Sequence, residues 1–130
     1  MTGVDEAPAA LLAAFDAYER ALAANDLAAL DASFARADDT IRSDDSGLLV
    51  GHGAISAFRA GRGGIRPRRI SDIHYRRLGD TTALLVSESQ YEDGGRGVQT
   101  QIWQSRGGGW VIIAAHVTAR IRRLDRPGEP

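Results

Sequence analysis

The chain has neither cysteine nor lysine among its 130 residues. The absence of cysteine excludes disulfide bonds, thiolate metal sites and cysteine nucleophiles. All 16 basic residues are arginines, and 17 acidic residues bring the net charge to −1 at pH 7 with histidine neutral. A net charge this close to zero indicates no nucleic-acid partner. The arginines point to anion recognition only where a few of them converge.

Long apolar runs are also missing, since none approaches the roughly 20 residues that span a membrane. The first ten residues, MTGVDEAPAA, are acidic where a secretory signal is basic. We therefore expect a cytoplasmic protein with no membrane contact. The length and the 43% hydrophobic content suit one domain. We place this domain at residues 1–124 and expect residues 125–130 to be a flexible tail.

Apolar residues recur at helical spacing in the first third of the chain. One stripe, formed by Leu11, Phe15, Tyr18 and Leu22, predicts a long first helix. Asp26 is a suitable N-cap for a second, short helix. Residues 51–62 predict a third helix, which the glycines that follow would end. Glu19 lies off the apolar stripe, so we expect its side chain to be solvated.

The rest of the chain predicts β-structure. Extended runs between glycine-rich turns place strands near residues 68–77, 81–91, 97–105 and 110–122. Residues 40–42 begin an extended segment, and residues 43–50 are expected to form a loop. Helices followed by hairpins indicate an α+β fold, in which three N-terminal helices pack on one face of a curved antiparallel sheet. Such chains commonly form a cone-shaped barrel with a cavity at its open end.

The final hairpin, VQTQIWQSRGGGWVIIAAHVT, carries polar residues expected to line that cavity. With residues 106–109 as the turn, Gln101 would pair with Ala114 and Gln99 with His116. Alternation then gives one mixed face, formed by Gln99, Gln101, Trp103, Ile112, Ala114 and His116. The other face is almost wholly apolar and is a candidate dimer surface, formed by Ile102, Val111, Ile113, Ala115 and Val117. A shift of one residue in register would exchange these partnerships.

Arginines on neighbouring elements could meet at the cavity. Arg59 and Arg62 are one helical turn apart, so they share a face of the third predicted helix. Arg42 lies at the start of an extended segment. Two or three converging guanidiniums would bind a carboxylate bidentately. The arginine-rich run at residues 66–69, by contrast, is expected to be a solvated loop.

Tyr18 and His116 are the titratable candidates. A buried tyrosine hydroxyl needs a partner, so Tyr18 is either a residue at the core edge or a proton donor in the cavity. His116 either forms structural hydrogen bonds or is part of the pocket.

The spacing of the three histidines matches no metal motif. Because the glycines at 61–64 follow a helix rather than a strand, they form no phosphate loop, and we expect neither metal nor cofactor.

Four segments in order resemble one known family. They are Phe15-x-x-Tyr18-Glu19-x-Ala21-Leu22, Thr40-Ile41-Arg42, Gly51-His52-x-x-Ile55-x-x-Phe58-Arg59-x-x-Arg62, and Gln99-Thr100-Gln101-x-Trp103 leading to Gly109-Trp110 and Ala114-Ala115-His116-Val117. This pattern is similar to the AtzH-like family, which includes HpxZ-like proteins, within the nuclear-transport-factor-2-like superfamily (SnoaL and ketosteroid isomerase relatives). The resemblance spans roughly residues 11–118.

The resemblance implies a cone-shaped barrel and a homodimer. It also implies an enzyme that acts on a small anionic carboxylated urea or amide, with an amidase as a further partner. Carried over by position, Tyr18 and Arg42 would be the catalytic pair, with Arg59, Arg62 and His116 in the pocket. The loop after Arg42 departs from the family pattern, which bears on the identity of the substrate.

Two other functions stay open. A non-catalytic binding or accessory protein for a carboxylate metabolite would need the arginines but no proton donor. A ketosteroid-isomerase-like or SnoaL-like isomerase or cyclase would need an acidic base in an apolar pocket. Asp38, Asp39 and Asp44 are available for that role, but an arginine-lined cavity argues against it. In each case Gln101 and Trp103 are expected to form a wall of the binding site.

Overall fold

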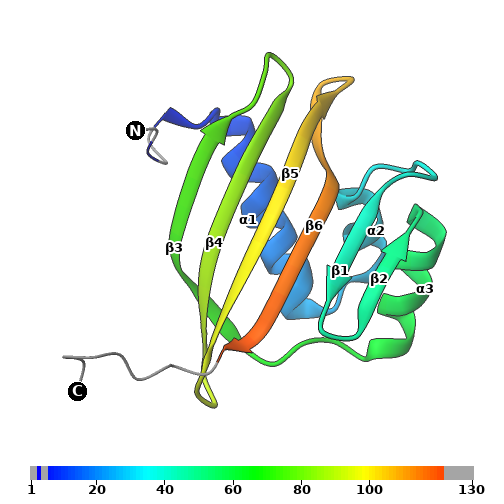
Figure 1. Ribbon diagram of the computed structural model, residues 1–130, viewed down its shortest axis with the longest axis vertical. Helices are drawn as coiled ribbons and strands as arrows, with labels where there is room; N and C mark the ends of the chain where they lie inside the picture. Colours follow the sequence, from blue (N-terminus) through cyan, green and yellow to red (C-terminus); the bar gives the residue numbers. More distant parts are fainter. Residues whose placement is uncertain (1–2, 4–5, 122–130) are drawn as a thin grey trace.

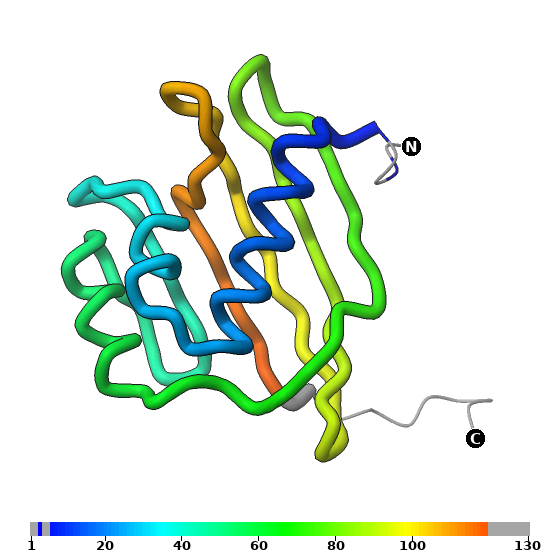
Figure 2. The backbone as a smooth tube through the Cα atoms, turned by 180° about the vertical axis from the view of Figure 1, so that it is seen from behind, coloured from blue at the N-terminus to red at the C-terminus, as the bar shows by residue number. Residues whose placement is uncertain are grey.

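The computed structural model describes residue 3 and residues 6–121. The helices are α1 (Ala9–Ala24), α2 (Leu27–Ser33) and α3 (His52–Arg62), and the strands are β1 (Ile41–Asp44), β2 (Gly47–Val50), β3 (Arg68–Arg77), β4 (Thr82–Tyr91), β5 (Arg96–Arg106) and β6 (Gly109–Ile121). One six-stranded sheet has the order β2-β1-β6-β5-β4-β3. All three helices lie on one face of it (Figure 1, Figure 2). The predicted α+β fold is confirmed. The predicted tail lies outside the described residues.

The sheet is mixed rather than wholly antiparallel. Strand β1 runs parallel to β6, while the other neighbouring strands are antiparallel. The loop predicted for residues 43–50 is wrong, because β1 and β2 form a short hairpin there, with Ile41 opposite Val50 and Asp44 opposite Gly47. The Asp44 carboxylate closes the turn by accepting hydrogen bonds from the backbone N–H and the hydroxyl of Ser46. The hairpin thereby adds two strands to the side of the sheet that α3 covers.

The core is built on the apolar stripe of α1, as predicted. All four stripe residues, Leu11, Phe15, Tyr18 and Leu22, are buried. The helix ends where Asn25 adopts a left-handed conformation with φ 51°. Asp26 then caps α2 by accepting a hydrogen bond from the Ala29 N–H at 3.1 Å, which confirms that expectation. In the described part of the chain, no helix combines the length and apolarity that a membrane span needs.

A β-bulge corrects the predicted register of the final hairpin. Trp103 pairs with Ile112 as expected, but Ile102 pairs with Ala114, so Ile113 is the extra residue on β6. Beyond the bulge Gln101 lies opposite Ala115. The structure therefore turns Ala115 and Val117 inward and Ala114 and His116 outward, the reverse of the prediction. The inward placement of Gln99, Gln101, Trp103 and Ile112 agrees with it.

Candidate functional site

One row of residues crosses the inner face of the sheet and brings β1 and β5 to the same level. Arg42 lies opposite Ala115 on β6, and Ala115 lies opposite Gln101 on β5. Both polar side chains are buried, with Arg42 5% and Gln101 1% exposed. The small, buried side chain of Ala115 separates them. The bulge at Ile113 is what sets this alignment.

Helix α1 places Tyr18 above that row. The Tyr18 ring packs edge-on against Trp103, with centroids 6.4 Å apart, and against Phe34 at 6.0 Å. Its hydroxyl has no hydrogen-bond partner among the described residues. Burial raises the pKa of Tyr18 above its ordinary value of 10, although Arg59 and Arg42 oppose this shift. At neutral pH the phenol is therefore protonated and can donate a proton.

Helix α3 contributes two further guanidiniums, as its spacing predicts. The Arg59 guanidinium lies 4.4 Å from the centroid of the Phe34 ring, and Arg62 lies 5.5 Å from that of Phe58. Arg42 reaches the same Phe58 ring at 4.8 Å. Burial is the main cause that lowers the pKa of Arg59 and of Arg62, but a guanidinium stays charged at neutral pH. We call Arg42, Arg59 and Arg62 the arginine cluster.

Two carboxylates hold two members of the arginine cluster in place. Arg42 Nη1 donates to Asp44 Oδ2 at 2.7 Å, and Arg59 Nη1 donates to Asp31 Oδ1 at 3.2 Å. Burial opposes ionisation of Asp44, but the hydrogen bonds from Ser46 and Arg42 outweigh it and lower the pKa of Asp44 to about 2. Asp44 is therefore a paired carboxylate at neutral pH, and its low pKa makes it a weak base.

Asp31 was not found by sequence reasoning. Besides Arg59, it accepts a hydrogen bond from the Ser56 hydroxyl at 2.8 Å through Oδ2, and its backbone carbonyl accepts one from His52 Nε2 at 2.7 Å. The three partners lie on one face of α3, so Asp31 fixes that helix against α2. The polar spacing of His52, Ser56 and Arg59 at helical intervals was the signal that could have revealed it.

Three nitrogens of the arginine cluster are buried without a hydrogen-bond partner. They are Arg59 Nη2, Arg62 Nε and Arg62 Nη2. Buried donors are rarely left unpaired in proteins, so each one needs an explanation. Here they lie beside a phenol that also lacks a partner. This combination of free donors and protonated tyrosine defines the candidate site.

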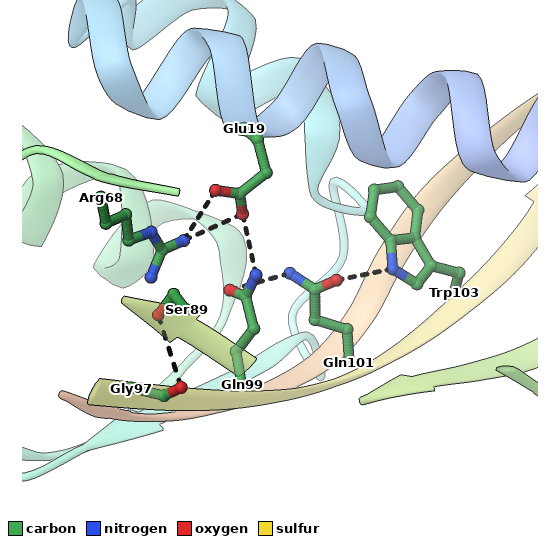
Figure 3. Close-up of polar contacts among 7 residues, drawn as sticks. All are labelled: Glu19, Arg68, Ser89, Gly97, Gln99, Gln101 and Trp103. Carbon is green, nitrogen blue, oxygen red and sulfur yellow. Dashed lines mark hydrogen bonds and ion pairs between the residues drawn. The ribbon is translucent and has the colours of Figure 1, made fainter. Parts of the chain in front are cut away.

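A chain of hydrogen bonds runs along the inner face of β5 to α1 (Figure 3). Trp103 Nε1 donates to Gln101 Oε1 at 2.9 Å, Gln101 Nε2 to Gln99 Oε1 at 3.3 Å, and Gln99 Nε2 to Glu19 Oε2 at 2.8 Å. Arg68 Nη2 completes the chain by donating to both Glu19 oxygens. Because an indole is only a donor and a carboxylate only an acceptor, the chain has one possible direction. It fixes both glutamine side chains as a rigid wall.

This chain corrects two predictions. Glu19 was expected to be solvated and Arg68 to lie in a solvated loop, but their side chains are only 15% and 6% exposed. The reason is the curvature of the sheet, which brings the start of β3 and the start of β5 around the side of α1. Glu19 is therefore inside the molecule, although it lies one position off the apolar stripe.

A hollow of about 130 Å³ lies beside Glu19, and no member of the arginine cluster lines it. Its lining residues are Glu19, Ala23, Ile65, Arg66, Pro67 and Arg68. Glu19 and Arg68 pair there and leave one buried nitrogen, Arg68 Nε, without a partner, whereas the arginine cluster has three such nitrogens. We therefore place the candidate site at the cluster and not at this hollow.

The structure does not bring His116 to the site. Its side chain is exposed on the outer face of the sheet, where Nδ1 lies 2.7 Å from the Ser43 hydroxyl. The reversal follows from the bulge at Ile113, which no feature of the sequence marks. Within residues 6–121, no group of three histidine or acidic side chains could hold a metal ion.

Comparison with known proteins places the chain in a family. The model of the AtzH-like family matches residues 4–122. The chain belongs to the AtzH-like family. No curated protein matches it at a significant level.

Solved structures confirm the fold of this AtzH-like protein. A cystatin-like fold protein from Burkholderia xenovorans LB400 is 32% identical, with coverage of 88% of this chain and 92% of that one and a TM-score of 0.79. A protein of unknown function of the DUF3225 family from Pectobacterium atrosepticum is 34% identical, with coverage of 85% and 88% and a TM-score of 0.79. An NTF-2 like protein from Shewanella oneidensis, 16% identical over 83% and 95% of the two chains, shares the fold with a TM-score of 0.71.

Proposed function

We propose that this AtzH-like protein is a small-molecule enzyme that hydrolyses an anionic carboxylated urea or amide, with loss of carbon dioxide, in the breakdown of nitrogen compounds. The observation that carries the proposal is the unpartnered Tyr18 hydroxyl beside the arginine cluster. Asp31, Asp44 and Glu19 are each bound to an arginine, so Tyr18 is the proton donor of this site. The arginines suit an anionic substrate, and the Tyr18 hydroxyl suits a substrate whose leaving nitrogen needs a proton.

In the proposed reaction, water adds to the carbonyl carbon of the urea or amide. The carbonyl oxygen takes up negative charge, which Arg42 and Arg59 stabilise. The C–N bond then breaks, and the nitrogen keeps the electron pair, takes the Tyr18 proton and leaves as ammonia. A proton of the attacking water restores Tyr18. With a urea substrate, the carbamic acid product loses carbon dioxide.

Purified protein incubated with carboxylated ureas and with oxalurate-type compounds tests the proposal. We expect release of ammonia, and of carbon dioxide from the ureas, that depends on Tyr18 and Arg42. Arg69→Gln is the matched control for Arg42→Gln, because Arg69 is an exposed residue on β3. Turnover that survives both Tyr18→Phe and Arg42→Gln would show that the mechanism is wrong.

A binding or accessory protein is the second candidate. Carboxylates and aromatic rings already hold the arginine cluster in place. Guanidiniums fixed in this way could bind the carboxylate of a ligand without catalysing a reaction. Tight binding of a small carboxylate with no turnover, or co-purification with an amidase, would favour this function. An isomerase with an aspartate base has less support, because Asp38 and Asp39 are exposed and Asp44 is paired with Arg42.

We further propose that the protein is a homodimer formed through the outer face of the sheet. An apolar row crosses five strands on this face, formed by Val50, Ile41, Ala114, Ile102 and Leu84. Val50 is 54% and Ile41 39% exposed, and the helices cover only the opposite face (Figure 2). A two-fold axis through this row would bury it against itself.

A further inference from the structure

We propose that the Nε–Nη2 edge of Arg62 binds the single carboxylate of the substrate. This inference rests on the proposed function and names the substrate class more narrowly, as a urea or amide with one carboxylate. Both nitrogens of this edge are buried and have no hydrogen-bond partner. Their N–H bonds point to the same side of the guanidinium, in the geometry that grips two carboxylate oxygens at once.

Arg62 differs from the other two members of the arginine cluster in its partners. Arg42 is paired with Asp44 and Arg59 with Asp31. Within the described residues Arg62 forms no ion pair, and its guanidinium is held by the Phe58 ring at 5.5 Å. A ring contact fixes the plane of a guanidinium and leaves its edge free. The Arg62 guanidinium is therefore held in one orientation, while its Nε–Nη2 edge is bound to no carboxylate of the described residues.

The charges of the site are balanced except for one. Asp44 and Asp31 offset two of the three guanidiniums, Tyr18 is neutral, and Glu19 and Arg68 offset each other. One carboxylate on Arg62 would neutralise the remaining charge. A second carboxylate would place an uncompensated charge in a buried site, which is strongly unfavourable.

With an amide substrate, the same balance favours release of the product. Hydrolysis converts the amide into a second acid group, so this product carries one charge more than the site can offset. Arg59 Nη2, the third unpartnered donor, is available to the neutral carbonyl oxygen of the substrate. Besides burial, which has the larger effect, Arg42 and Arg59 lie close enough to Arg62 to lower the pKa of its guanidinium.

The turn after Arg62 is the route by which we expect a ligand to reach it. Arg62 is the last residue of α3, and Gly63 and Gly64 follow with φ of 78° and 99°. Glycine adopts these conformations without strain, so the turn can adjust while the sheet stays in place. We therefore expect a carboxylate to enter at this end of α3.

Calorimetric titration with three planar probes of similar size tests the inference. Oxamate has one carboxylate and one amide, oxalate has two carboxylates, and oxamide has none. We expect oxamate to bind at least about tenfold more tightly than oxalate, and oxamide not to bind. Arg62→Gln should weaken oxamate at least about tenfold, whereas Arg69→Gln should bind like wild type.

Arg62→Lys separates the effect of the paired N–H groups from the effect of the charge. It also tests the inference if Arg62→Gln does not fold. A lysine keeps the charge but cannot form the paired hydrogen bonds, so oxamate affinity should fall with it as well. Oxalate binding as tight as oxamate would overturn the one-carboxylate inference, and unchanged oxamate affinity in both Arg62 variants would overturn the role of Arg62. Either result leaves the proposed function standing if turnover persists. Failure of all anions to bind would overturn both.

Discussion

Arg42 Nη1 donates a hydrogen bond to Asp44 Oδ2 at 2.7 Å, and this pair within β1 orients the Arg42 guanidinium. The pKa of Asp44 falls from 3.8 to about 2. Because the folded-state pKa is depressed, this contribution to stability is fully present above about pH 4 and is lost as the pH falls towards 2. Asp44→Asn should lower the free energy of unfolding by about 1–2 kcal/mol at pH 7 and by much less at pH 2. Urea unfolding of both proteins across this range measures the difference, and a penalty that does not change with pH would contradict it.

Asp31 should matter more for stability than an ordinary surface carboxylate. Asp31→Ala leaves the Arg59 guanidinium, which is 1% exposed, without its charge partner and removes the Ser56 contact. We expect a loss of about 2–3 kcal/mol in the free energy of unfolding. Asp16→Ala is the matched control, because it breaks an exposed ion pair with Arg20 and should cost less than about 0.5 kcal/mol. Equal costs in the two variants would show that Asp31 does not anchor α3.

Glu19 should stabilise the fold through Arg68 and Gln99. Glu19→Gln removes the charge that the buried Arg68 guanidinium needs and places an NH2 donor against the donor of Arg68 or of Gln99. A loss of about 1–3 kcal/mol is expected in denaturant unfolding. Glu88→Gln weakens a more exposed contact with Arg96 at 3.5 Å and should have little effect. If Glu19→Gln were as mild as Glu88→Gln, the directional chain would not contribute to stability.

The outer face of the sheet should control the oligomeric state. Ile41→Glu places a charge in the centre of the exposed apolar row without touching the inner face. Light scattering after size exclusion should give a dimer for the wild type and a monomer for this variant. Leu78→Glu, at an exposed residue outside that row, should remain a dimer. A monomeric wild type would contradict the dimer proposal.

The helices and strands followed from local rules. The apolar stripe of α1, the Asp26 cap and the glycine-rich turns depend on residues close together in the chain, so the sequence alone indicated them. The errors arose where distant elements meet. The bulge at Ile113 depends on how β6 adapts to β5 and to the segment at Phe34, which bridges to Ile112, and it moved His116 out of the site.

The site was predicted in part for the same reason. Arg59 and Arg62 were grouped correctly, because helical spacing is a local property. The alignment of Arg42 with Gln101 needs the parallel pairing of β1 with β6, which joins segments more than 70 residues apart in the sequence. The roles of Asp31 and Glu19 depend on how the helices sit on the curved sheet. No sequence pattern specifies that packing.

The most direct test of the central claim is the rate of ammonia release from a one-carboxylate urea by wild type and by Tyr18→Phe. Removing only the hydroxyl should lower the rate at least about 100-fold, because a proton donor contributes that much or more. Oxamate affinity and stability should stay close to wild type, since the hydroxyl forms no hydrogen bond with any residue that the structure describes. The account predicts this separation of turnover from binding. A Tyr18→Phe variant that releases ammonia at the wild-type rate would contradict it.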